Sequence, residues 1–204
     1  MDYYKKYLKY KNKYLELKQL GGGPSNANMV LWAQGRVNKY ILFTVEPRHR
    51  SGPKFSLPGG GLERGEHSQT ILGAVREYVE EMGIRTREFP KIDGQDVLKR
   101  DSKGKVSGSY IPPKHKATTH RGNYHTDVYY GRIDPSELKY NRRHVKNGET
   151  VDYVLIKLDD AKSLAMGNTV TAKNKDQSKS YTLKLRECQQ STLHKMLIDK
   201  KLLD

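Results

Sequence analysis

A glycine-rich turn followed by an amphipathic, acidic segment constrains this 204-residue chain more than any other feature. The turn spans residues 57–65, and the segment that follows, 66–84, contains Glu77, Glu80 and Glu81. If the segment is a helix, with about 100° per residue, its apolar side chains from 71 to 82 share one face. The three glutamates lie together on the opposite face. Gly83 then supplies the residue type at which helices commonly end.

Carboxylates on one helix face repel one another, because like charges raise each other's pKa and lower stability. Arg76 stands one turn from Glu80, but Glu77 and Glu81 face each other one turn apart. Mg²⁺ or Mn²⁺ would resolve this repulsion, since both ions prefer carboxylate oxygens. The glycines let backbone groups approach the same ion. A solvated acidic face is the simpler interpretation of the glutamates alone. The glycine turn and the Arg-Glu pair favour a metal site.

Residues 57–84 resemble the Nudix box, G-x5-E-x7-R-E-U-x-E-E-x-G-U, in which U is apolar. Gly60 and Glu66 match its first glycine and glutamate. Residues 76–84 match every fixed position of the second half, with a tyrosine at the first apolar position. Nine residues separate Glu66 from Arg76, where the family has seven. We expect the two extra residues to lengthen the loop before the helix, with Ser68 as its N-cap.

The resemblance implies a fold and a set of site residues. The fold would be α+β, a Nudix-type α/β/α sandwich around a mixed β-sheet. The implied catalytic residues are Arg76, Glu77, Glu80 and Glu81. The implied metal ligands are Glu77, Glu81, Glu80 and Gly60. The implied substrate contacts are Arg48, Gly59, Gly61 and Glu66. A further base or metal ligand would come from beyond the box, with Glu149 and Asp152 as first candidates and Asp127 and Glu137 as weaker ones.

The charge balance favours a polyanionic partner. The chain has 38 lysines and arginines against 23 acidic residues, which gives a net charge of +15 and favours nucleic acid, nucleotides or an anionic membrane surface. Its single cysteine, Cys188, excludes an internal disulfide and indicates a reducing compartment, the host cytoplasm or a virion if the chain is viral. The longest apolar run, around 40–45, is too short to span a bilayer. We therefore expect a cytoplasmic protein without integral membrane association.

Three parts are expected along the chain. Residues 1–20 form a basic amphipathic helix, 21–28 a linker, and 29–204 a Nudix hydrolase domain with a basic insert at about 93–123. The first part resembles N-terminal extensions of many unrelated giant-virus proteins, which suggests a viral source. Two roles stay open for it: an arm that contacts a partner, nucleic acid or a membrane surface, or a helix that packs on its own domain.

Hydrophobic alternation and turn residues predict the elements of the domain. Strands are expected at 29–34, 39–46, 55–57, 84–92, 126–133 and 149–158. A short helix is expected from 159, a loose loop at 167–180 and a terminal helix at 185–203.

Together these features predict a divalent-metal-dependent pyrophosphohydrolase, acting on a phosphorus anhydride in a nucleoside diphosphate linked to another moiety. The basic insert and N-terminal arm favour an RNA-linked substrate such as a capped 5′ end. One alternative is hydrolysis of a small free nucleotide such as ADP-ribose or a dinucleoside polyphosphate. The other is a non-catalytic Nudix-fold module that binds RNA.

Overall fold

The computed structural model describes residues 25–47, 54–103, 106–109, 116–121, 124–145, 150–199 and 203. The expected N-terminal helix and the candidates Arg48 and Glu149 lie outside the described residues. Within the described ranges, every helix is too short or too polar to cross a membrane.

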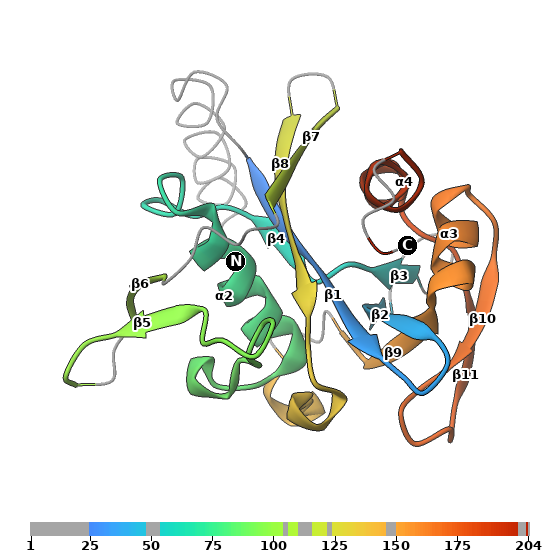
Figure 1. Cartoon of the computed structure of the whole chain (residues 1–204), viewed down its shortest axis with the longest axis horizontal. Coiled ribbons are helices and arrows are strands. Elements are labelled where there is room, and N and C mark those ends of the chain that lie inside the picture. Colours follow the sequence, from blue (N-terminus) through green and yellow to red (C-terminus); the bar gives the residue numbers. More distant parts are fainter. Residues whose placement is uncertain are drawn as a thin grey trace, which may run out of the picture.

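Seven strands of the described residues form a mixed sheet at the centre of the fold (Figure 1). β1 (Asn26–Gln34) is antiparallel to β2 (Lys39–Glu46) and parallel to β8 (Tyr124–Arg132). β7 (Lys116–Arg121) pairs with β8, and β9 (Asp152–Lys157) pairs with β2. These strands confirm four of the expected ones, and the mixed sheet confirms the expected fold class.

Two short strands lie where β1 and β2 separate. β3 (Lys54–Ser56) pairs with the end of β2, and β4 (Gly59–Gly61) pairs with the beginning of β1. Between them, the carbonyl of Pro58 accepts a hydrogen bond from the amide of Met29 at 2.7 Å. The chain thereby crosses from β2 to β1, and this crossing brings the glycines beneath the acidic helix.

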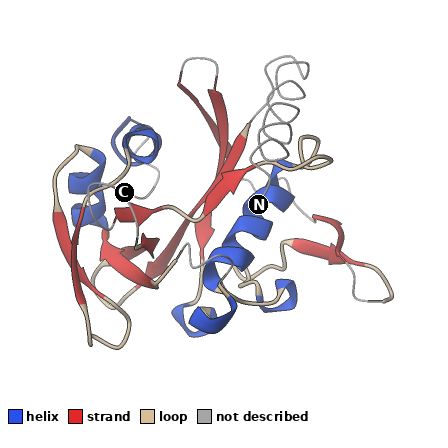
Figure 2. Ribbon diagram, turned by 180° about the vertical axis from the view of Figure 1, so that it is seen from behind, coloured by secondary structure: helices blue, strands red, loops and turns tan. Residues whose placement is uncertain are grey.

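Helices cover both faces of the sheet. α2 (Thr70–Met82) lies on one face, and α3 (Leu158–Ala165) and α4 (Glu187–His194) lie on the other (Figures 1 and 2). The described part of the chain is therefore an α/β/α sandwich. Alternation along β1 feeds both layers, because successive strand side chains point to opposite faces. Met29 and Leu31 pack toward α2, whereas Val30 packs toward α3 and α4.

α2 forms because its apolar stripe has a surface to cover. Ile71, Ala74, Val75, Tyr78 and Met82 are all at most 3% exposed. Burying a side chain of this size contributes about 1.5–3 kcal/mol. The helix ends at Gly83 in the left-handed conformation, with φ of 62°, as its glycine predicted.

Tyr78 fills an apolar position of the box with its ring. The ring packs edge-on against Phe89, with centroids 5.1 Å apart. The hydroxyl is buried and has no hydrogen-bond partner among the described residues. Burial and, to a smaller extent, Tyr153 raise its pKa above the usual tyrosine value. The tyrosine is therefore a core residue.

Two predictions are wrong, one of a strand and one of a loop. The segment expected as a strand at 84–92 contains the 3₁₀ helix η1 (Thr86–Glu88), closed by a 2.8 Å hydrogen bond from the amide of Arg85 to Glu88. The segment expected as a loose loop contains the hairpin of β10 (Val170–Lys173) and β11 (Ser180–Leu183). Apolar residues at 170, 172, 181 and 183 pack on the core, and this tertiary contact decides the hairpin.

Several boundaries also differ from expectation. β1 begins within the expected linker, and Gln69, not Ser68, is the N-cap of α2, without a side-chain hydrogen bond. The basic insert contains β5 (Leu98–Arg100), β6 (Val106–Ser109) and β7. α4 continues as the π-helix η5 (Lys195–Asp199). The remaining short helices are η2 (Pro135–Glu137) and η3 (Arg142–His144).

Candidate metal site

Arg76, in the middle of α2, contacts four carboxylates. Its Nε and Nη2 donate to the two carboxylate oxygens of Glu66 at 2.9 and 3.2 Å. Its Nη1 donates to Glu77 at 2.9 Å and to Glu80 at 3.5 Å. The same nitrogen lies 3.9 Å from a carboxylate oxygen of Glu63. One guanidinium carries one positive charge, so these contacts position the carboxylates more than they neutralise them.

The loop before α2 folds back onto the helix through the same guanidinium. Nη2 of Arg76 donates to the carbonyl of Gly61 at 2.7 Å, and the amide of Glu63 donates to Glu66 at 2.7 Å. Part of the nine-residue spacer, 67–69, lies in the turn before α2. The longer spacer therefore leaves the Glu66–Arg76 pair intact.

Both members of this pair are held in their charged forms. Burial lowers the pKa of Arg76, but the hydrogen bond to Glu66 and the charges of Glu77 and Glu66 outweigh it and raise the pKa above its usual value. Burial likewise raises the pKa of Glu66. Hydrogen bonds from Arg76 and from the Glu63 amide outweigh it, so this pKa lies below the ordinary 4.5.

The backbone of β4 packs directly against the carboxylate of Glu77. A Cβ placed on Gly60 would lie 2.6 Å from the carboxyl carbon of Glu77, so the carboxylate at the end of that side chain would have to shift. Gly61 has space, since its nearest neighbour would be Oδ1 of Asn26 at 3.9 Å. Gly59 has a φ of 146°, a backbone conformation that residues with a side chain rarely adopt. Backbone conformation thus requires Gly59, and a side chain at position 60 would displace the carboxylate of Glu77.

Glu81 lies against β2. Its carboxylate accepts a 3.4 Å hydrogen bond from the hydroxyl of Thr44, which is buried and also lies 3.2 Å from the carbonyl of Ser56. Glu77 and Glu81 are thus placed by different strands, β4 and β2. Thr44 was not a sequence candidate, because a threonine inside a strand carries no signal of such a contact.

The donor chemistry of the acidic face fits a hard divalent ion, although the ligands are not gathered. Among the described residues, no three acidic, histidine or cysteine side chains are grouped so that they could hold a metal ion. Glu77 and Glu80 are turned toward Arg76. Carboxylate oxygens one turn apart beside the β4 backbone are nevertheless the ligand types that Mg²⁺ and Mn²⁺ prefer. Binding would draw these carboxylates away from the guanidinium.

The candidates beyond the box lie elsewhere. Asp152 accepts hydrogen bonds from the Asn174 amide and the Tyr181 hydroxyl, both at 3.0 Å. It pairs in register with Val45, whose side chain belongs to the core beneath α3 and α4. The alternation of β9 therefore directs Asp152 to the face opposite α2. The structure does not bring Asp152 to the glutamates, and it uses this carboxylate to hold the β10–β11 hairpin.

Asp127, a weaker candidate by sequence, contacts the start of α2. It is 1% exposed, and its two oxygens accept hydrogen bonds from Thr70 at 2.6 Å and Thr118 at 2.9 Å. The hydroxyl of Tyr129 lies 2.5 Å from that of Thr70. These bonds fix the N-terminal end of α2 on β8 and β7. Glu137 lies apart from them and accepts a hydrogen bond from the amide of Lys91 at 2.7 Å.

Neither models of known protein families nor curated proteins give a match to this chain. Solved structures do. A Nudix hydrolase of M. smegmatis is 13% identical, with a TM-score of 0.49, over 89% of this chain and 88% of that one. An Ap4A hydrolase of C. elegans is 14% identical, with a TM-score of 0.43, over 67% and 82%. A Nudix hydrolase of Nitrosomonas europaea is 15% identical, with a TM-score of 0.39, over 69% and 76%.

The chain's own features define the type of domain. The domain is an α/β/α sandwich around a mixed sheet. The box begins in the glycine strand β4, and its second half lies largely in the acidic helix α2. Arg76 joins the two halves of the box through Glu66, Gly61 and Glu77. These features of the described residues are the ones that the chain shares with the Nudix pattern.

Substituting Gly60 tests the contact between β4 and Glu77. We expect Gly60→Ala to lower the free energy of unfolding by about 1–2 kcal/mol, because the new methyl group displaces the Glu77 carboxylate from its hydrogen bond with Arg76. Gly61→Ala is the matched control, and it should stay within about 1 kcal/mol of wild type, since its methyl group has space. Urea unfolding measures both variants. Equal losses for the two would contradict the contact.

Glu66 makes stability depend on pH. Its pKa in the folded chain is below the unfolded value of 4.5, so its contribution is complete above that pH and is lost as pH falls through the folded pKa. We expect Glu66→Gln to destabilise the chain at neutral pH, and its difference from wild type to shrink as the pH falls below 4.5. Glu63→Gln, at an exposed side chain, is the control. A difference that is constant with pH would refute the assignment to the Glu66 carboxylate.

Proposed function

We propose that this protein is a divalent-metal-dependent pyrophosphohydrolase that cleaves a nucleoside diphosphate linked to another moiety. The supporting observation is the packing of the Gly60 backbone against the carboxylate of Glu77 on the acidic face of α2. This packing places the backbone of a glycine strand and an acidic helix side by side. A diphosphate and its counter-ions need both kinds of group.

Mg²⁺ or Mn²⁺, when bound, neutralises the diphosphate and lowers the pKa of a water molecule. The residues that would hold the ion are Glu77, Glu81, Glu80 and the backbone carbonyl of Gly60. Arg76 orients Glu77 and Glu80 from one side through its Nη1. The backbone of Gly59 and Gly61 would contact the substrate, together with Arg48 and Glu66.

The general base would come from the helix. A base is most effective when its pKa is close to the working pH, and the Arg76 contacts lower the pKa of Glu66 further from neutrality. Asp152 is held on the other face of the sheet. Of the candidates that the structure describes, this leaves the three helix glutamates, and the proton of the attacking water would pass to one of them; Glu149, the other candidate, lies outside the described residues.

Glu81 provides the test of hydrolysis. We expect Glu81→Gln to reduce turnover at least about a hundredfold, because the amide keeps the side-chain shape and loses the charge that an ion needs. Stability should change little, since the 3.4 Å contact with Thr44 is long for a hydrogen bond. Turnover is measured on a panel of nucleotide diphosphates with Mg²⁺ and Mn²⁺. Glu63→Gln, on an exposed carboxylate nearby, is the control. Unchanged rates in Glu81→Gln would overturn the proposal.

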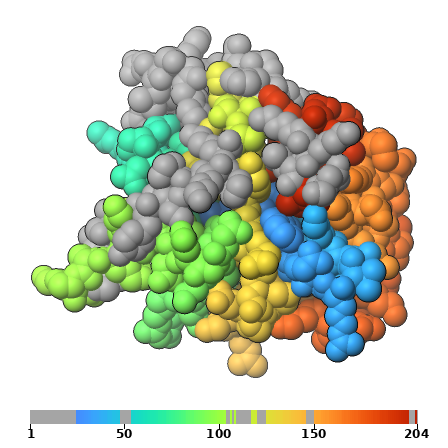
Figure 3. Space-filling view, viewed as in Figure 1, coloured from blue at the N-terminus to red at the C-terminus, as the bar shows by residue number. Residues whose placement is uncertain are grey.

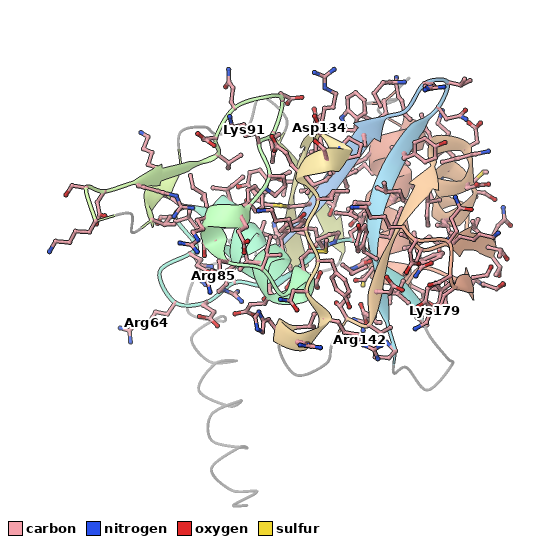
Figure 4. The ribbon with its side chains drawn as sticks, turned by 90° about the horizontal axis from the view of Figure 1, so that it is seen from below. Arg64, Arg85, Lys91, Asp134, Arg142 and Lys179 are labelled. Atoms are coloured by element: carbon pink, nitrogen blue, oxygen red, sulfur yellow. The ribbon has the colours of Figure 1, made fainter. Side chains whose placement is uncertain are left out.

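A substrate attached to RNA suits the charge of the chain. Exposed arginines surround α2: Arg64 in the loop before it, Arg85 just after it, and Arg142 in η3, a segment packed on its C-terminal end. Figure 4 shows Arg64 directed away from the domain. The β5–β6 hairpin, with exposed Lys99 and Lys103 near its turn, projects from the same side of the molecule (Figures 1 and 3). A free nucleotide needs fewer basic contacts than such a surface offers.

Salt dependence separates RNA from a free nucleotide. We expect capped RNA to be hydrolysed with a KM that rises steeply with salt, because contacts to phosphates release counter-ions. A free cap dinucleotide should show a much weaker dependence. Lys99→Gln combined with Lys103→Gln should flatten the salt dependence for RNA alone. If RNA length and salt make no difference, a small free nucleotide is the better substrate.

A further inference from the structure

Gln189 in α4 is a buried polar residue that contacts the chain just before the glycine strand. The residue is 7% exposed. Oε1 accepts a hydrogen bond from the amide of Leu57 at 2.7 Å. Nε2 donates to the hydroxyl of Ser56 at 2.7 Å and lies 3.4 Å from the carbonyl of Leu57. One side-chain amide therefore serves both backbone groups of a single residue.

Leu57 lies at the step between β3 and β4. The ladder between β3 and β2 ends at Ser56, and the ladder between β4 and β1 begins at Gly59. A buried backbone amide without a partner costs about 1–3 kcal/mol, so residues at such a step need hydrogen bonds from elsewhere. Gln189 supplies them in place of a neighbouring strand. No local pattern in the sequence indicates this contact, because the two residues are 132 positions apart.

α4 is itself firmly attached to the sheet. The hydroxyl of Thr192 lies 3.3 Å from that of Thr119 in β7, and Nζ of Lys195 donates to the carbonyl of Thr118 at 3.3 Å. Arg186, at the start of the helix, forms an ion pair with Glu46 at the end of β2. Leu193 is fully buried in the core on this face. These contacts hold the helix in place on the sheet, so the position of Gln189 beside Leu57 is fixed.

We propose that Gln189 is a positioning residue, which sets the place of the Gly59–Gly60 backbone beside Glu77 from the opposite face of the sheet. Leu57 is two residues from Gly59, and Pro58 between them restricts the backbone. A shift of Leu57 is therefore transmitted to the glycine strand, where Gly60 lies directly against the carboxylate of Glu77. The effect on metal binding rests on the proposed function, whereas the hold on Leu57 does not.

Hydrogen exchange tests the hold on Leu57 without reference to activity. We expect the Leu57 amide to exchange about tenfold faster in Gln189→Met, because the side chain keeps its length and loses both polar atoms. Gln189→Glu should keep the amide protected, since a carboxylate oxygen still accepts the bond. Gln190→Met, the same change one residue along α4, is the matched control. Protection of Leu57 in Gln189→Met equal to that in Gln190→Met would overturn the proposal. If Gln189→Met fails to fold, Gln189→Ala carries the same test: it also removes both polar atoms, so the Leu57 amide should exchange about tenfold faster, and wild-type protection would overturn the proposal.

Mn²⁺ titration followed by electron paramagnetic resonance tests the coupling to the metal site. We expect the dissociation constant for Mn²⁺ to rise about tenfold in Gln189→Met and to stay near the wild-type value in Gln190→Met. Faster exchange at Leu57 with unchanged Mn²⁺ affinity would overturn the positioning role. If the wild-type chain neither binds Mn²⁺ nor hydrolyses any diphosphate, the proposed function fails and the coupling fails with it. The exchange experiment still decides separately whether Gln189 holds Leu57.

Discussion

The approach of a glycine backbone to a carboxylate is the contact on which the rest of the site depends. Gly60 lies so close to Glu77 that a methyl group added to it would displace the carboxylate. This closeness arises because β3 and β4 cross between β2 and β1, directly beneath α2. The crossing determines where the glycines lie. The apolar stripe of α2 packs on the sheet and so determines the distance between the glutamates and these glycines. A sheet with continuous β1–β2 pairing would offer no such strand.

The contacts of Arg76 with nearby carboxylates offset part of the repulsion on the acidic face of α2. Like charges on one helix face repel one another, and Arg76 is shared among two carboxylates of that face, Glu77 and Glu80, and two of the loop before the helix, Glu63 and Glu66. The sharing holds Glu66 ionised and keeps the longer loop on the helix. It also turns Glu77 and Glu80 toward the guanidinium. A divalent ion would therefore compete with Arg76 for ligands that are already oriented.

Particular elements show where sequence reasoning succeeds and where it stops. The helix over the box, its end at Gly83 and the strands at 29–34 and 39–46 follow from local periodicity and agree with the structure. The hairpin at 170–183 was taken for a loop, because its few apolar residues become significant only when they meet the core. Asp152 looked suitable by type and position. Its place on the far face depends on the register of β9, which no local pattern reveals.

The sequence by itself determined the acidic face, the arginine at its centre and the glycines before it, because these depend on residue type and on spacing within one helix and one turn. Tertiary structure alone decided that Glu81 meets Thr44, that Asp127 holds the start of α2 and that Gln189 holds Leu57. These contacts join residues 37, 57 and 132 positions apart. Their geometry arises only when the sheet has assembled, since side chains on separate strands and helices share no local periodicity.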